Sequence, residues 1–214
     1  MIKIALLGAE STGKTQLAAA ITASLRSQGH SVSPISETLR QWCDQAGRTP
    51  RADEQLAIAQ THTARIAQAL PATYLIADTT ALMTAVYSDL LFGDDSLYAS
   101  ALEQQRGFDV TLVMGLDLPW AADPQRDGPH SRAPVDAALR VALARGHLPY
   151  QVVYGKDIAR TRNALHAIES IATSADRIYA RGRFSLKSAA WVWNCEKCSD
   201  PECEHKLFSG LLNR

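Results

Sequence analysis

The chain has 214 residues, of which 46% are hydrophobic and 21% charged, so it is long enough to bury one good core. Its 22 basic and 22 acidic residues give a formal net charge of zero, which argues against a nucleic-acid or membrane-surface partner because both favour a positive excess. No apolar run is long enough to span a bilayer and the N-terminus lacks a signal sequence, so we expect a cytoplasmic protein.

The first predicted unit is a strand, a loop and a helix. Residues 2–7 form a short apolar run typical of a buried strand, and residues 14–28 carry apolar side chains at helical spacing. The segment between them fits G-x-x-x-x-G-K-[ST], the phosphate-binding loop or P-loop, in which the lysine reaches the outer phosphates and the last hydroxyl binds Mg²⁺. We therefore predict a nucleotide site made by Gly8, Glu10, Ser11, Thr12, Gly13, Lys14 and Thr15.

Two further predicted strands lead into carboxylates. A strand over 31–36 precedes Glu37, and a strand over 74–77 precedes Asp78, with a helix over 52–70 between them. An aspartate after an apolar strand is typical of a Walker B position, where it would face the Mg²⁺ held by Thr15. The alternative is that Asp78 is a turn or cap residue.

The second half of the chain continues the alternation. Helices are predicted over 80–92, 95–106, 134–145 and 157–172, and strands over 108–114 and 150–154. Strands that alternate with helices predict an α/β fold with a five-stranded, parallel, doubly wound sheet that binds ligands at the carboxyl ends of its strands. The P-loop, Glu37 and Asp78 would all lie at that edge.

The segment 117–132 is rich in proline, glycine and charge, and it predicts a long mobile loop. In a phosphoryl-transfer enzyme such a loop would act as a lid that excludes water. Arg126 and Arg132 would then offset charge on the transferring phosphoryl group. The alternative is a solvated loop whose arginines are ordinary surface residues.

The pattern changes after residue 172, so we divide the chain into a nucleotide-binding domain over 1–172 and a C-terminal extension over 173–214. The extension contains a set of four soft ligands: Cys195, Cys198, Cys203 and His205. A Cys₃His set suits a closed, structural Zn²⁺ site in a reducing compartment. Free or redox-active thiols are the alternative. Cys43 is expected to be a buried thiol.

With these landmarks in place, the sequence resembles the ribosylnicotinamide kinase domain of the bifunctional nicotinamide-nucleotide adenylyltransferase/ribosylnicotinamide kinase family. The resemblance covers roughly residues 1–172. Its motifs are the Gly8–Thr15 loop with Glu10-Ser11, Glu37-x-x-Arg40, Asp78-Thr79, Phe108-Asp109-Val110-Thr111 and Trp120-x-x-Asp123-x-x-Arg126. It implies a P-loop kinase, AAA-type ATPase-like, that transfers the γ-phosphoryl of ATP to the 5′-hydroxyl of nicotinamide riboside. Glu37, Arg40, Trp120 and Asp123 would bind that substrate.

The sequence also departs from this family. Ser36 and Thr38 stand where the family has aromatic residues that would stack on the nicotinamide ring, and Thr80 replaces the second aspartate of an Asp-Thr-Asp motif. The sequence has no counterpart to the adenylyltransferase part, and the cysteine-rich extension is not part of the resemblance.

We therefore expect an ATP- and Mg²⁺-dependent kinase of a small riboside or nucleoside. Asp78 is interpreted as the metal-side carboxylate and Glu37 as the substrate-side one, with exchange of these roles left open. ATP is favoured over GTP because no clear Asn-Lys-x-Asp guanine-reading run follows a late strand. The alternatives are a kinase for another nucleoside or nucleotide, and a regulatory P-loop ATPase that docks partners through the zinc module.

Overall fold

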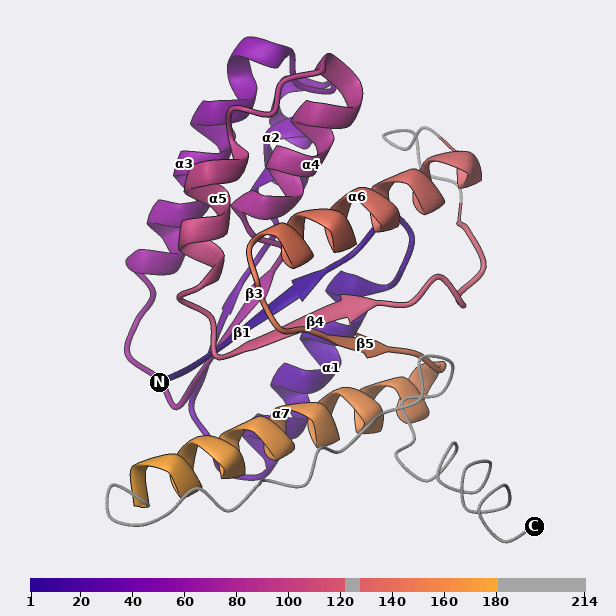
Figure 1. Cartoon of the computed structure of the whole chain (residues 1–214). Coiled ribbons are helices and arrows are strands. Elements are labelled where there is room, and N and C mark those ends of the chain that lie inside the picture. The colour runs from indigo at the N-terminus through magenta and orange to yellow at the C-terminus, as the bar shows by residue number, and fades with distance from the viewer. Residues whose placement is uncertain (122–127, 181–214) are drawn as a thin grey trace, which may run out of the picture.

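A computed structural model describes residues 1–121 and 128–180, with side chains described up to Ile171. The α/β fold with a five-stranded parallel sheet is confirmed (Figure 1). The strands lie in the order β2-β3-β1-β4-β5. They are β1 (Ile2–Leu7), β2 (Val32–Ile35), β3 (Tyr74–Asp78), β4 (Val110–Met114) and β5 (Gln151–Val153).

Helices cover both faces of this sheet. They are α1 (Lys14–Ser27), α2 (Thr38–Ala46), α3 (Gln55–Ala67), α4 (Ala81–Phe92), α5 (Tyr98–Gln105), α6 (Arg132–Arg145) and α7 (Asp157–Ala180), with short 3₁₀ turns at Ala52–Glu54 and Pro129–Ser131. Figure 1 shows α1 and α7 on one face and α6, with the α2–α5 group, on the other.

The sequence of β1 explains this double cover. Side chains alternate along a strand, so Ala5 and Leu7 pack with α4, α5 and α6, while Ile4 and Leu6 pack with α1 and α7. All four side chains have no exposed area. A strand buried on both faces has an unbroken apolar sequence, and this is why residues 4–7 are all apolar.

The strand register brings the predicted functional residues to one edge. Leu6 of β1 pairs with Asp78 of β3, and Leu7 pairs with Val113 of β4. The P-loop therefore leaves β1 beside the end of β3 on one side and the end of β4 on the other. Chain connections diverge to the two sides of β1 here, and such switch points are where open parallel sheets bind ligands.

The structure differs from the sequence prediction in four helices. Residues 38–46, for which no helix was predicted, form α2. The helix predicted from residue 52 begins as a 3₁₀ turn and becomes α-helical only at Gln55. The helix predicted from Pro134 begins earlier, because α6 starts at Arg132, the last residue of the predicted loop over 117–132. In addition, α7 continues to Ala180, beyond the predicted boundary at residue 172.

Cys195, Cys198, Cys203 and His205 lie outside the described residues, so the zinc site stays a prediction. Within residues 1–121 and 128–180, no group of three or more His, Cys, Asp or Glu side chains is placed to hold a metal ion. The described helices also include none that is long and apolar enough to cross a membrane. Cys43 is buried and not in a disulfide, as expected.

Candidate functional site

Two glycines give the P-loop its path from β1 into α1. Gly8 has φ +146° and Gly13 has φ +78°, which side-chain-bearing residues rarely adopt. A Cβ atom on Gly8 would also lie 2.9 Å from Cβ of Met114, and one on Gly13 would lie 2.9 Å from Cδ1 of Leu118. Both motif glycines are therefore required by conformation, and Gly8 is also required by its close packing against the end of β4.

Thr15 and Asp78 meet across the loop, as the sequence predicts. The Thr15 hydroxyl donates to Oδ2 of Asp78 at 2.6 Å. Asp78 is only 3% exposed, and its second oxygen, Oδ1, is buried without a hydrogen-bond partner in the described structure. An unpaired buried acceptor costs about 1–3 kcal/mol. A carboxylate oxygen with spare capacity beside a hydroxyl suits Mg²⁺, which prefers oxygen ligands.

The remaining P-loop side chains hold the loop closed on itself. The Lys14 ammonium donates to the carbonyl oxygens of Gly8 and Ala9, both at 2.9 Å. Thr12 is fully buried and donates to the Ala9 carbonyl at 2.7 Å. Ser11, with φ +56°, accepts a hydrogen bond from the backbone N–H of Ala121 at 2.7 Å. The loop is thus tied to the segment that follows β4.

A cavity of about 770 Å³ opens on one side of the P-loop. Glu37 and Arg40, from the start of α2, line it together with P-loop residues Glu10–Gln16. The nearest charged atoms of Glu37 and Arg40 are 4.0 Å apart, so their ion pair is weak and both side chains face the cavity with little mutual constraint. Other lining residues are mainly apolar and come from α2, α3, α4 and the segment between α2 and α3: Leu39, Cys43, Pro50, Gln55, Tyr87, Leu91 and Phe92.

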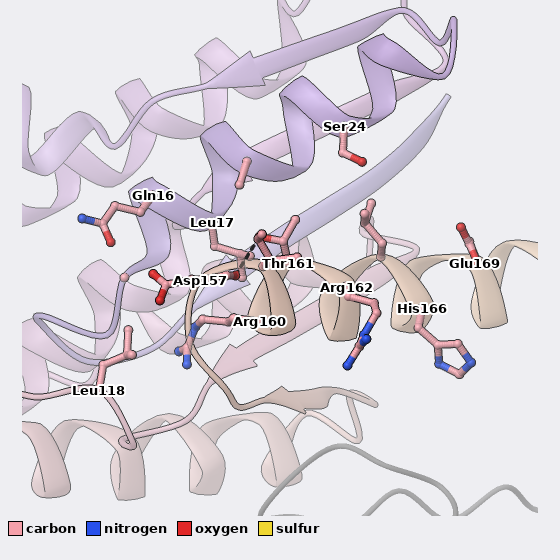
Figure 2. Close-up of a pocket in the computed structure, with 14 residues that line it drawn as sticks. Gln16, Leu17, Ser24, Leu118, Asp157, Arg160, Thr161, Arg162, His166 and Glu169 are labelled. Atoms are coloured by element: carbon pink, nitrogen blue, oxygen red, sulfur yellow. Dashed lines mark hydrogen bonds between the residues drawn. The ribbon is translucent and has the colours of Figure 1, made fainter.

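A second cavity of about 840 Å³ lies on the other side, between α1 and α7 (Figure 2). Gln16 and Leu17 line it from α1, and Asp157 and Thr161 line it from α7. Three residues belong to both cavities: Gly13, Gln16 and Leu118. The P-loop therefore stands at the junction of two separate spaces.

Arg132 lies near this junction but not on a loop. It is the first residue of α6, is 8% exposed and donates through Nη1 to the Leu118 carbonyl at 2.9 Å. Its Nε and Nη2 atoms are buried without a partner among the described residues. Trp120 is half-buried, and its indole N–H likewise has no partner in the described structure. Asp123 and Arg126 lie outside the described residues.

Comparison with protein families identifies the domain. A family model described as an AAA domain matches residues 3–160. The chain belongs to this AAA domain family. Comparison with curated proteins gives no match.

Among solved structures, the AAA domain is similar to NadR. The structure of NadR in complex with NAD and AMP-PNP has a TM-score of 0.62 at 17% identity over 89% of this chain. NadR in complex with NR has a TM-score of 0.67 at 18% identity over 87% of this chain. This chain spans about half of each NadR chain, 52% and 53%. A deoxyadenosine kinase from M. mycoides, with products dCMP and dCDP bound, gives 0.49 at 16% identity over 83% of this chain and 100% of that one. At 17% and 18% identity, the similarity to the two NadR structures shows a shared fold and nothing further.

The AAA domain contains an ion pair between a buried arginine and a partly exposed aspartate, which sequence reasoning missed. Arg160 of α7 is 4% exposed and donates to Asp117 Oδ1 at 3.0 Å, to the Gly155 carbonyl at 2.9 Å and to the Thr12 carbonyl at 2.9 Å. Asp117 also accepts from the Gly155 N–H at 2.7 Å. The pair thus joins the P-loop to the segments after β4 and β5. Its two members are 43 residues apart, so no local motif indicated it.

A buried histidine connects the two carboxylate-bearing strand ends of the AAA domain. His62 is 2% exposed; its Nε2 donates to the Thr79 carbonyl at 3.0 Å, and its Nδ1 lies 2.8 Å from the Thr38 hydroxyl. Because a carbonyl only accepts, Nε2 carries the proton and Nδ1 accepts from Thr38. Burial lowers the pKa of His62 below its ordinary value of 6.5. Thr79 has φ +72°, so the bond fixes an unusual backbone next to Asp78.

Cys43 and Gln55 are also functional candidates that only the structure reveals. Burial, and secondarily the charge of Glu37, raises the pKa of the Cys43 thiol, so it lines the cavity as a neutral, largely apolar group. Gln55 is 2% exposed, lines the same cavity, and its Oε1 is buried without a hydrogen-bond partner in the described chain. Both residues lie on helices that line the cavity only because segments distant in sequence pack beside them, so no local pattern indicated them.

Proposed function

We propose that this chain is an ATP-dependent kinase that phosphorylates the 5′-hydroxyl of nicotinamide riboside to give nicotinamide mononucleotide. The observation that carries the proposal is the position of the P-loop at the junction of two cavities. ATP with its phosphates on the P-loop and its base toward the α1–α7 cavity would direct its outermost phosphate to the cavity that holds Glu37. An ATPase switch needs no second cavity of this kind.

The identity of the acceptor is supported by resemblance. The motifs shared with ribosylnicotinamide kinases lie around the P-loop, Glu37 and Asp78, and the NadR structures share the fold at TM-scores of 0.62 and 0.67. The aromatic residues that Ser36 and Thr38 replace have substitutes on another element. Tyr87 and Phe92 of α4 line the cavity and would offer ring contacts to a nicotinamide.

On the nucleotide side, the chain supplies phosphate and metal ligands. P-loop backbone N–H groups and the start of α1 would bind phosphate oxygens, and the Lys14 ammonium would exchange the Gly8 and Ala9 carbonyls for the outer phosphates. Thr15 and Asp78, with its unpaired Oδ1, would hold Mg²⁺. Bound there, Mg²⁺ neutralises negative charge on the phosphates.

On the acceptor side, Glu37 would orient the 5′-hydroxyl and take its proton, with Asp78 as the alternative base. The hydroxyl oxygen forms a bond to the γ-phosphorus, the bond from that phosphorus to the β–γ bridging oxygen breaks, and ADP leaves. Arg40 would help to hold the riboside. The two unpaired nitrogens of Arg132, together with Arg126, would offset charge on the transferring group, and Trp120 and Asp123 would help to bind the riboside.

The test is a phosphorylation screen. Purified protein is incubated with MgATP and a panel of nicotinamide riboside, adenosine, deoxyadenosine, cytidine, uridine and guanosine, and phosphorylated product and ADP are both quantified. We expect the nicotinamide riboside product at the highest kcat/KM. Lys14→Ala and Asp78→Ala should each lower turnover by about 100-fold or more, because each removes a charge that contacts the phosphates or their metal.

Lys3→Ala is the matched control, because Lys3 lies at the amino end of β1, on the edge of the sheet opposite the P-loop. It should retain full activity. If another nucleoside is phosphorylated and nicotinamide riboside is not, the proposed acceptor is wrong but the protein is still a kinase. ADP formation that no riboside stimulates, without any phosphorylated product, would refute the kinase and favour the switch.

A further inference from the structure

Gln55 lines the 770 Å³ cavity that the proposed function assigns to the acceptor, here called the acceptor cavity. The same lining includes Leu39 and Cys43 from α2 and Leu91 and Phe92 from α4. The lining also includes P-loop residues and Glu37. The cavity thus offers polar groups suited to phosphoryl transfer together with apolar and aromatic side chains suited to a planar ring.

The Gln55 side chain is prepared for a hydrogen bond that the described protein does not supply. It is the first residue of α3 and is 2% exposed, and its Oε1 has no partner among the described residues. Buried side-chain polar atoms are paired in the great majority of cases, so an exception at the wall of a cavity indicates a ligand group. The unpaired atom is an acceptor, so the missing partner is a donor.

Resting on the proposed kinase function, we propose that Gln55 determines acceptor specificity by hydrogen bonding to a neutral carboxamide on the ring of the riboside. The carboxamide N–H₂ group donates to Gln55 Oε1, which a ring carboxylate has no proton to do. The carboxamide oxygen remains available to the Gln55 N–H₂ group. The enzyme should therefore prefer nicotinamide riboside over nicotinic acid riboside, although the two differ only at this substituent.

The experiment measures kcat and KM for both ribosides with the wild type, Gln55→Leu and Gln55→Glu. The wild type should favour the amide riboside by at least about 10-fold in kcat/KM. Gln55→Leu removes both hydrogen-bonding atoms at similar size, so it should lower kcat/KM for the amide about 10- to 100-fold, chiefly through KM, and leave the carboxylate riboside little changed.

Gln55→Glu separates recognition from folding. A carboxylate still accepts from the ligand N–H₂ group, so the amide riboside should be used within about 10-fold of the wild-type rate, while the carboxylate riboside is rejected further by like charge. The matched control is Gln60→Leu, an exposed glutamine on the same helix, which should change neither constant. Calorimetric titration of each riboside in the absence of ATP gives the same comparison without turnover.

The outcomes distinguish the two proposals. Wild-type turnover of ribosides with a preference that neither Gln55 variant alters would overturn the role of Gln55 and leave the kinase intact. Loss of turnover with both ribosides in Gln55→Leu, at unchanged MgATP binding and with Gln55→Glu equally inactive, would also overturn it, because the residue would then be structural. No turnover of any riboside by the wild type would overturn both.

Discussion

Individual residues around Asp78 are held in place by a chain of hydrogen bonds that starts outside the P-loop. Arg65 donates to the Thr38 hydroxyl at 3.3 Å, Thr38 donates to His62, and His62 donates to the carbonyl of Thr79. Nε2 of His62 carries the proton because its partner is a carbonyl, and Nδ1 of the neutral imidazole then accepts from the Thr38 hydroxyl. The network therefore requires the neutral imidazole and connects the start of α2, beside Glu37, to the end of β3.

The pKa of His62 predicts how stability depends on pH. Burial is the main cause of its lowering below 6.5; the Arg65 charge lowers it further, and the Thr79 hydrogen bond and the Asp78 charge oppose the shift. Between the folded pKa of His62 and about pH 6.5, the unfolded chain binds more protons than the folded protein. The contribution of His62 to the free energy of unfolding is therefore complete above about pH 6.5 and is lost as pH falls through the folded pKa.

His62→Gln keeps a donor for Thr79 and removes the titration. Urea denaturation at pH 7.5 and pH 5.5, in EDTA, should show that the free energy of unfolding falls more in the wild type than in His62→Gln over this interval. Equal falls in the two proteins would show that His62 is not the group responsible.

At the scale of elements, the nucleotide site depends on three loops that leave neighbouring strands. The Arg160 guanidinium contacts carbonyls from two of them and the Asp117 carboxylate from the third, and it does so from the first turns of α7. These bonds fix the P-loop backbone at Thr12, in the middle of the phosphate-binding segment. The pair should therefore support both folding stability and nucleotide affinity.

Arg160→Leu should lower the free energy of unfolding by about 2 kcal/mol, because removal of the guanidinium leaves the buried Thr12 carbonyl without its donor. Arg160→Lys, which retains the charge but not the forked donors, should lose less. Arg162→Leu, an exposed arginine two residues away, is the control and should stay within about 0.5 kcal/mol of the wild type. Urea titration measures all three. A loss in Arg160→Leu no larger than in the control would contradict this role.

For the whole molecule, the sequence was enough to predict the sheet, the P-loop and the meeting of Thr15 with Asp78. These features follow from local signals, namely apolar strands of β1 and β3 followed by polar residues, and from the rule that parallel strands end at one edge. The helix α2 was missed although Leu39, Trp42, Cys43 and Ala46 fall at helical spacing, because its 9 residues are fewer than the window over which this periodicity is normally assessed.

The 770 Å³ cavity beside the P-loop was beyond sequence reasoning for a different reason. The cavity is lined by residues of α2, of α4 and of the first turn of α3. The apolar pattern of one helix does not indicate which helix, distant in sequence, lies opposite it. Arg132 illustrates the same limit. The proline- and glycine-rich run around it indicated a loop, whereas the structure has it buried at the start of α6 with its guanidinium on the Leu118 carbonyl.

A crystal structure with Mg²⁺, a non-hydrolysable ATP analogue and nicotinamide riboside would test the arrangement as a whole. We expect the triphosphate on the P-loop, with Lys14 on its outer phosphates, the metal beside Thr15 and Asp78, and the riboside in the 770 Å³ cavity with its 5′-hydroxyl between Glu37 and the γ-phosphate. A triphosphate bound elsewhere, or a saturating riboside that leaves this cavity empty while the nucleotide is in place, would contradict it.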